Sequence, residues 1–120
     1  MIDYFIVKKK IVLNIPVKRA LRKLGQDIKE ARIRRNITIA MMAERANVTA
    51  ITVAKTEKGD PSVSFGTYAT VIFILGMIDK LQNLLDLSGD VIGRQLAEEQ
   101  LPKRVRLPKR LKPNPNTGEQ

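Results

Sequence analysis

Apolar residues recur at steps of three and four from residue 20 onward, which is the spacing of one face of an α-helix. Leu21, Leu24, Ile28 and Ala31 form the first such stripe and predict a helix that runs to about residue 35. The opposite face of this helix is basic and carries Arg22, Lys23, Lys29 and Arg34. A glycine inside a helix costs about 1 kcal/mol relative to alanine. The presence of Gly25 in this helix therefore indicates that another element approaches it closely.

Two short helices are predicted next, each preceded by a threonine that can cap its first turn. Thr38 caps a helix over residues 39–46, and Thr49 caps a helix over about 50–58. The second helix ends where Gly59 offers a left-handed cap and Pro61 forbids continuation. Two short helices joined by a tight turn are typical of a helix-turn-helix.

Three further helices follow this pair. One begins near Ser64 and ends at Gly76, and its inward positions are expected to be Phe65, Tyr68, Val71, Ile72 and Leu75. A fifth helix begins at Ile78, with Leu81, Leu84 and Leu85 as its apolar stripe. Residues 88–101 predict a weaker C-terminal helix. The organisation is thus an all-α domain over residues 20–87, followed by one helix.

The two ends of the chain have different patterns from the middle. Residues 1–19 are rich in β-branched residues up to Pro16 and predict an N-terminal arm that is either extended as a strand or disordered. Residues 102–120 mix four prolines with lysine and arginine, so we expect a flexible basic tail.

Charge separates the ends from the middle as well. The chain of 120 residues has a net charge of +10. Residues 1–37 carry 11 Lys/Arg and 3 Asp/Glu, residues 38–100 carry 5 and 8, and residues 101–120 carry 6 and 1. A strongly basic balance indicates a polyanionic partner, nucleic acid or an anionic surface. The basic flanks are the parts expected to grip phosphate.

Several classes of function are excluded or disfavoured by composition. The chain has no cysteine and no histidine, which leaves no disulfide, no thiolate or histidine metal site and no His-activated nucleophile. We therefore expect no catalytic residues, no metal and no cofactor, and not an enzyme. No apolar run is long enough to span a membrane, and no signal peptide is recognisable, so a cytoplasmic protein is expected.

The stretch LGQDIKEARIRRNITIAMMAERANVTAITVAKTEKGDPSVSFGTYATVIFILGM, residues 24–77, resembles the Xre/Cro-type (lambda-repressor-like) DNA-binding domain. The motif elements are Leu24-Gly25, Met42-Ala43, Val48-Thr49, Glu57-Lys58-Gly59, Thr67 and Leu75-Gly76. The resemblance implies a five-helix bundle whose third helix enters the major groove of DNA.

The same resemblance implies roles for individual residues. Base-reading positions would be Thr49, Ala50, Ile51, Ala54 and Lys55. Phosphate-binding positions would be Thr38, Lys58, Arg34, Arg35, Ser62 and Ser64. Arg32 and Glu57 match a structural ion pair of the family, and Ile39 stands where the family usually has a phosphate-binding glutamine. Leu81, Leu84 and Leu85 are either ordinary core residues or a homodimer interface.

A narrower resemblance, to HipB-type antitoxins, lies in EKGDPSVSFGTYATVIFILGM and in EEQLPKRVR. It implies a transcriptional repressor of a type II toxin-antitoxin operon that also binds a HipA-like serine/threonine kinase. Two alternatives remain open: a stand-alone Xre-family regulator with no kinase partner, and an adaptor that binds protein rather than DNA.

Overall fold

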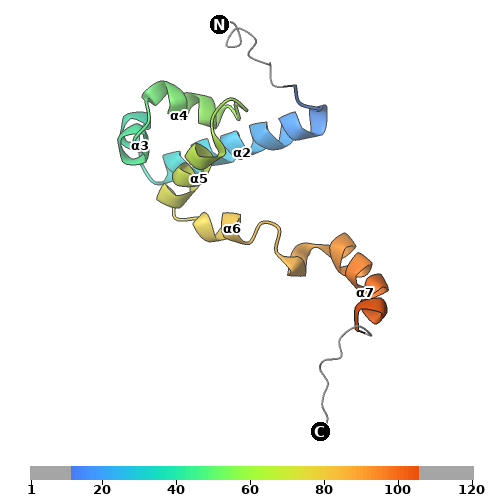
Figure 1. The fold of residues 1–120 in the computed structure, drawn as a ribbon. Coiled ribbons are helices and arrows are strands. Elements are labelled where there is room, and N and C mark those ends of the chain that lie inside the picture. Colours follow the sequence, from blue (N-terminus) through green and yellow to red (C-terminus); the bar gives the residue numbers. More distant parts are fainter. Residues whose placement is uncertain (1–11, 106–120) are drawn as a thin grey trace, which may run out of the picture. The chain divides into compact units, whose positions relative to one another are not determined.

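The computed structural model describes residues 12–105 of the chain, and within them it contains six helices and no strand (Figure 1). The helices are α2 (Ile15–Arg34), α3 (Ile39–Ala46), α4 (Ala50–Glu57), α5 (Phe65–Ile74), α6 (Ile78–Gln82) and α7 (Val91–Val105), with a 3-10 turn at Leu87–Gly89. The expected all-α class is therefore confirmed for the described residues.

Side-chain caps set the starts of three helices. Thr38, Thr49 and Ser64 are extended, and each side chain accepts a hydrogen bond from the backbone N–H three residues later. Such caps satisfy an amide that has no partner within the helix. The left-handed cap predicted at Gly59 is present, with φ of 73°, and Gly76, predicted only as a helix end, also has a positive φ, of 81°.

The described chain divides into two compact units, with the boundary after Leu81. The first unit has one apolar core, to which every helix from α2 to α5 contributes. Its buried apolar residues are Ile28, Ala31, Ile37, Met42, Ala43, Val53, Tyr68, Val71 and Leu75. Residues 82–100 of the second unit contain no buried side chain. No helix within residues 12–105 has the length and apolar character needed to cross a membrane.

The N-terminal arm is shorter than predicted, because residues 15–19 belong to α2 rather than to a strand. Pro16 lies in the first turn of the helix, where its missing N–H removes no helical hydrogen bond and its fixed φ suits the helix. Asn14 accepts from the amides of Val17 and Lys18 and so starts the helix. The first turns of α2 project beyond the other helices of the first unit (Figure 1). The predicted arm over residues 1–11 lies outside the described residues.

The fifth predicted helix is also shorter than expected. α6 ends at Gln82, so Leu84 and Leu85 follow it in a turn region and are exposed, while Leu81 is half-buried. The predicted helical stripe of these three leucines is therefore wrong. Asp86, which follows these leucines, starts a separate element. Its carboxylate accepts a hydrogen bond from the Ser88 amide and caps the 3-10 turn.

The C-terminal helix extends further than predicted, through to Val105, so the expected tail at 102 begins within α7. Residues 106–120 of that predicted tail lie outside the described residues.

Candidate nucleic-acid interface

The helix-turn-helix pair is formed by α3 and α4, which pack against each other across a turn of three residues (Figure 1). Asn47 adopts the left-handed conformation, with φ of 57° and ψ of 46°. Asparagine tolerates this region better than most residues because its short polar side chain can bond locally. The amide of Val48 donates to the carbonyl of Ala43, which closes the end of α3 before Thr49 opens α4.

The inner side of α4 is fixed by three buried residues, Val53, Thr56 and Glu57. Thr56 satisfies its hydroxyl within the helix by donating to the carbonyl of Thr52 at 2.8 Å. The opposite side is open: Ile51 is 69% exposed, and Thr49, Ala50 and Lys55 are exposed too. Ala54 is half-buried. Four of the five predicted base-reading residues thus lie on the free surface, and the fifth lies at its edge.

The Thr49 hydroxyl is both the N-terminal cap of α4 and a predicted base-reading group. It accepts the Thr52 amide at 3.1 Å and lies 3.0 Å from the Thr52 hydroxyl. Its capping role thus uses much of its hydrogen-bonding capacity, and Thr52, which the sequence analysis did not single out, is coupled to it. The unengaged polar group at the outward side of α4 is therefore the Lys55 ammonium, which has no hydrogen bond or ion pair among the described residues.

The predicted ion pair between Arg32 and Glu57 is present and buried. Arg32 Nε donates to Glu57 Oε2 at 2.5 Å and Nη2 donates to Oε1 at 3.1 Å. Arg32 Nη1 also donates to the carbonyl of Ile37 at 2.8 Å. One guanidinium therefore joins α2, the α2–α3 turn and the end of α4. It sets the orientation of α4 on the bundle.

The close approach predicted at Gly25 is present at the same end of α4. A Cβ added at Gly25 would lie 2.6 Å from the backbone nitrogen of Gly59 and 2.7 Å from the carbonyl oxygen of Glu57. A Cβ added at Gly59 would collide with the Leu21 carbonyl. The two glycines allow the backbones of α2 and the α4 C-terminus to touch.

The predicted phosphate-binding residues are all exposed, but they are not equally free. Thr38 and Ser64 are helix caps. Arg35 Nη1 donates to the Ala31 carbonyl at 2.8 Å and so closes the end of α2. The side chains of Arg34 and Lys58 make no hydrogen bond or ion pair among the described residues.

Ser62 is poorly suited to bind phosphate. Its amide and its hydroxyl both donate to Asp60 Oδ1, at 2.8 and 2.7 Å. These bonds hold the pKa of the Asp60 carboxyl below its usual value, so a negative charge persists beside the serine. A phosphate approaching Ser62 would be repelled by that carboxylate.

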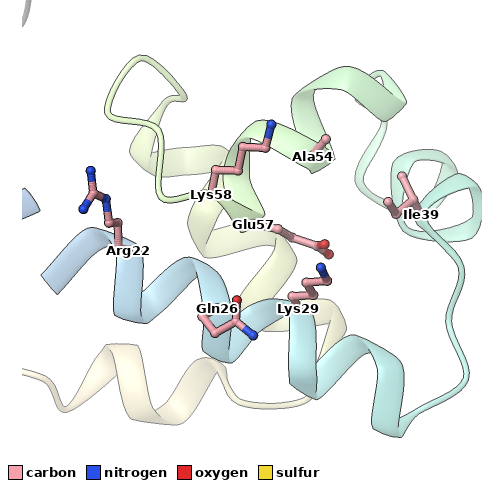
Figure 2. Close-up of a pocket in the computed structure, with 7 residues that line it drawn as sticks. All are labelled: Arg22, Gln26, Lys29, Ile39, Ala54, Glu57 and Lys58. Carbon is pink, nitrogen blue, oxygen red and sulfur yellow. The ribbon is translucent and has the colours of Figure 1, made fainter. Parts of the chain in front are cut away.

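A groove between α2 and α4 supplies basic residues that were not predicted as phosphate ligands (Figure 2). It has a volume of about 580 Å³ and is lined by Arg22, Gln26, Lys29, Ile39, Ala54, Glu57 and Lys58. The only signal for it in the sequence was the basic face of the first helix. Lys23 of that face is not part of the groove, since it pairs with Asp27 at 2.6 Å, and this bond raises the pKa of its ammonium.

The groove carries net positive charge beside the outward side of α4. Three cations, Arg22, Lys29 and Lys58, line it together with one carboxylate, that of Glu57. Both oxygens of this carboxylate accept from Arg32, and the Lys29 ammonium points toward it in Figure 2. Ile39, the first residue of α3, also lines the groove, so the N-terminus of that helix borders it. Cations beside a helix N-terminus suit a phosphodiester backbone.

The described residues contain no group of three or more acidic, histidine or cysteine side chains able to hold a metal ion. Comparison of the chain with protein-family models, with curated proteins and with solved structures found no match.

Proposed function

We propose that the chain is a sequence-specific DNA-binding protein of the Xre/Cro type that acts as a transcriptional repressor. The observation that carries the proposal is the division of α4 into an anchored side and a nearly neutral exposed side, beside a basic groove. Major-groove readers need this division, because base edges are read by short polar and methyl contacts whereas phosphates are held by cations.

In this proposal the exposed side of α4 enters the major groove. The Ile51 side chain and the methyl of Ala50 offer apolar contacts to thymine methyls, and Lys55 can donate to guanine O6 or N7. The groove residues Lys29 and Lys58, with Arg22, hold the adjacent strand, and Arg34 adds a further cation.

Fluorescence anisotropy tests the proposal directly. The chain is titrated against the DNA upstream of its own gene and against a scrambled duplex of the same length and base composition, at several salt concentrations. We expect tighter binding to the upstream duplex and a log–log salt slope near −0.9 for each phosphate contacted. Equal affinities for the two duplexes, or affinity independent of salt, would exclude the proposed role.

Replacing Lys55 by alanine is expected to weaken binding to the upstream duplex by about 1–3 kcal/mol, because a base-reading cation is lost. Binding to the scrambled duplex should change much less. The measurement is the same pair of titrations. A loss of the same size on both duplexes would assign Lys55 to phosphate rather than to bases.

The double variant Lys29→Gln, Lys58→Gln tests the groove. We expect a similar loss of affinity on both duplexes and a salt slope reduced by about 2, since two phosphate contacts disappear. Lys23→Gln is the matched control, because Lys23 lies on the same helix but is paired with Asp27. A slope that falls as much for Lys23→Gln as for the double variant would show that the groove has no special part in binding.

The narrower function, an antitoxin that binds a HipA-like kinase, rests on the resemblance. It is supported by six apolar side chains of the second unit that are each exposed, since proteins often use exposed apolar side chains to bind a partner. They are Leu84, Leu85, Leu87, Val91, Ile92 and Leu96. Co-purification with a kinase encoded beside its gene would support this function, and purification of both proteins apart would favour a stand-alone regulator.

A further inference from the structure

Helix α5 has two apolar faces, and the first unit covers only one of them. Its sequence, FGTYATVIFI, contains no charged residue. Tyr68, Val71 and Leu75 are buried in the core, yet Phe65 is 70% and Phe73 is 63% exposed. Phe65 was expected to face inward. At 100° per residue it lies roughly 85° from the centre of the buried stripe and in line with Ala69 and Phe73 instead.

We infer that this second face, the stripe of Phe65, Ala69 and Phe73, is where α5 packs against α5 of a second copy of the chain. The stripe is symmetric about its centre, with a small residue between two aromatic residues at equal distances. If two such helices pair antiparallel about Ala69, each Phe65 meets the partner's Phe73, about 6 Å along the axis from the centre. A two-fold interface requires this self-complementary layout.

The small central residue allows a close approach. Alanine at the crossing point lets helix axes come within about 8 Å. The flanking aromatic rings can then pack at the edges of the contact, the geometry that aromatic pairs prefer. Because α5 carries no charge, two copies can approach without like-charge repulsion along this helix. Because α5 has no charged residue, a partner protein that binds through ion pairs would find no charged side chain on this helix.

The buried area predicts how strong this contact is. An aromatic side chain can bury about 200 Å², so the exposed parts of Phe65 and Phe73 offer roughly 270 Å² per copy. Stable complexes bury about 800 Å² per partner. The α5 pair is therefore a transient contact on its own. The inference deepens the proposed function by placing a homodimer contact on α5. Its test uses no DNA, so the dimer contact and the DNA-binding function can fail independently of each other.

A single cysteine tests the contact, because the chain has none of its own. In the full-length Ala69→Cys variant the two central Cα atoms would lie about 4–7 Å apart, which a disulfide can span. Under a mild oxidant we expect dimers to form about tenfold faster than in Thr70→Cys, since the contact raises the local concentration of one thiol at the other. Thr70 is the matched control because it is exposed on α5 but lies off the stripe.

Phe73→Glu in the Ala69→Cys background is expected to reduce the cross-linking rate to that of Thr70→Cys. Phe73 is largely exposed, so this variant should keep the thermal transition of its parent. Three results would overturn the inference: equal cross-linking at residues 69 and 70, cross-linking at 69 that Phe73→Glu leaves unchanged, or a residue-69 thiol that stays monomeric and protected from alkylation. The last would mean that another segment of the same chain covers the stripe.

Discussion

Replacing Arg32 by alanine is expected to lower the free energy of unfolding by about 3–5 kcal/mol, because it leaves the buried Glu57 carboxylate without its partner. The side chains of Arg32 and Glu57 are only 9% and 5% exposed, so water cannot replace the lost hydrogen bonds. The Ile37 carbonyl loses its donor as well. Urea denaturation followed by circular dichroism measures the change.

Two further variants show whether the loss of stability in Arg32→Ala comes from the burial of an unpaired charge. Lys23→Ala breaks the exposed i,i+4 pair with Asp27 and should leave the free energy of unfolding almost unchanged, because water screens and replaces that pair. Combining Arg32→Met with Glu57→Leu removes both charges and should recover much of the stability lost in Arg32→Ala. If the single and double variants were equally unstable, the loss would come from packing and not from an uncompensated charge.

Replacing Gly25 by alanine is expected to destabilise the domain by about 1–3 kcal/mol, although alanine is the better helix former. The added methyl would meet backbone atoms of Glu57 and Gly59 at 2.6–2.8 Å. Backbone cannot rotate away as a long side chain can, so α2 and α4 would have to separate. The measurement is again the midpoint and slope of urea unfolding.

Gly66→Ala is the matched control for that prediction. Gly66 also lies in a helix, but a Cβ there would find its nearest neighbour, the Ser64 hydroxyl, at 3.8 Å, which is ordinary contact. This variant should be neutral or stabilising by up to about 1 kcal/mol. Opposite signs at the two glycines are the expected outcome. A Gly25→Ala variant as stable as Gly66→Ala would contradict the close packing of α2 on α4.

Local signals predicted most of the first unit correctly. The threonines before α3 and α4 form the expected caps, Gly59 adopts the expected positive φ, and α5 begins after Ser64 and ends before Gly76 as expected. These features act within one turn of the chain, so the sequence nearby contains all the information that determines them. The costly glycine in α2 also indicated a tertiary contact correctly.

Patterns that need a partner surface were predicted less well. Apolar periodicity predicts Phe65 as an inward residue and leaves Leu84 and Leu85 open between core and a homodimer interface, and all three side chains are exposed. Periodicity shows which residues share a face, but it does not show whether the fold places another element against that face. The β-branched residues before Pro16 predict a strand or a disordered arm that ends there, although proline suits the first turn of a helix equally well.

The candidate site also contains parts that could be predicted from local sequence and parts that could not. The outward residues of α4 and the Arg32–Glu57 pair could be predicted, because each follows from helical spacing or from the family resemblance. The groove could not, since it brings together residues of α2, α3 and α4 that are distant in the sequence. The engagement of the Ser62 hydroxyl by Asp60 depends on loop geometry and was missed for that reason.

The anchored and exposed sides of α4 have a consequence for how such a chain can evolve. Ala50, Ile51 and Lys55 add little to the core, whereas Val53, Thr56 and Glu57 hold the helix in place. Mutations at the first three positions can therefore accumulate at small cost to folding. Under the proposed function, paralogues could acquire new target sites while they inherit the same scaffold and the same basic groove.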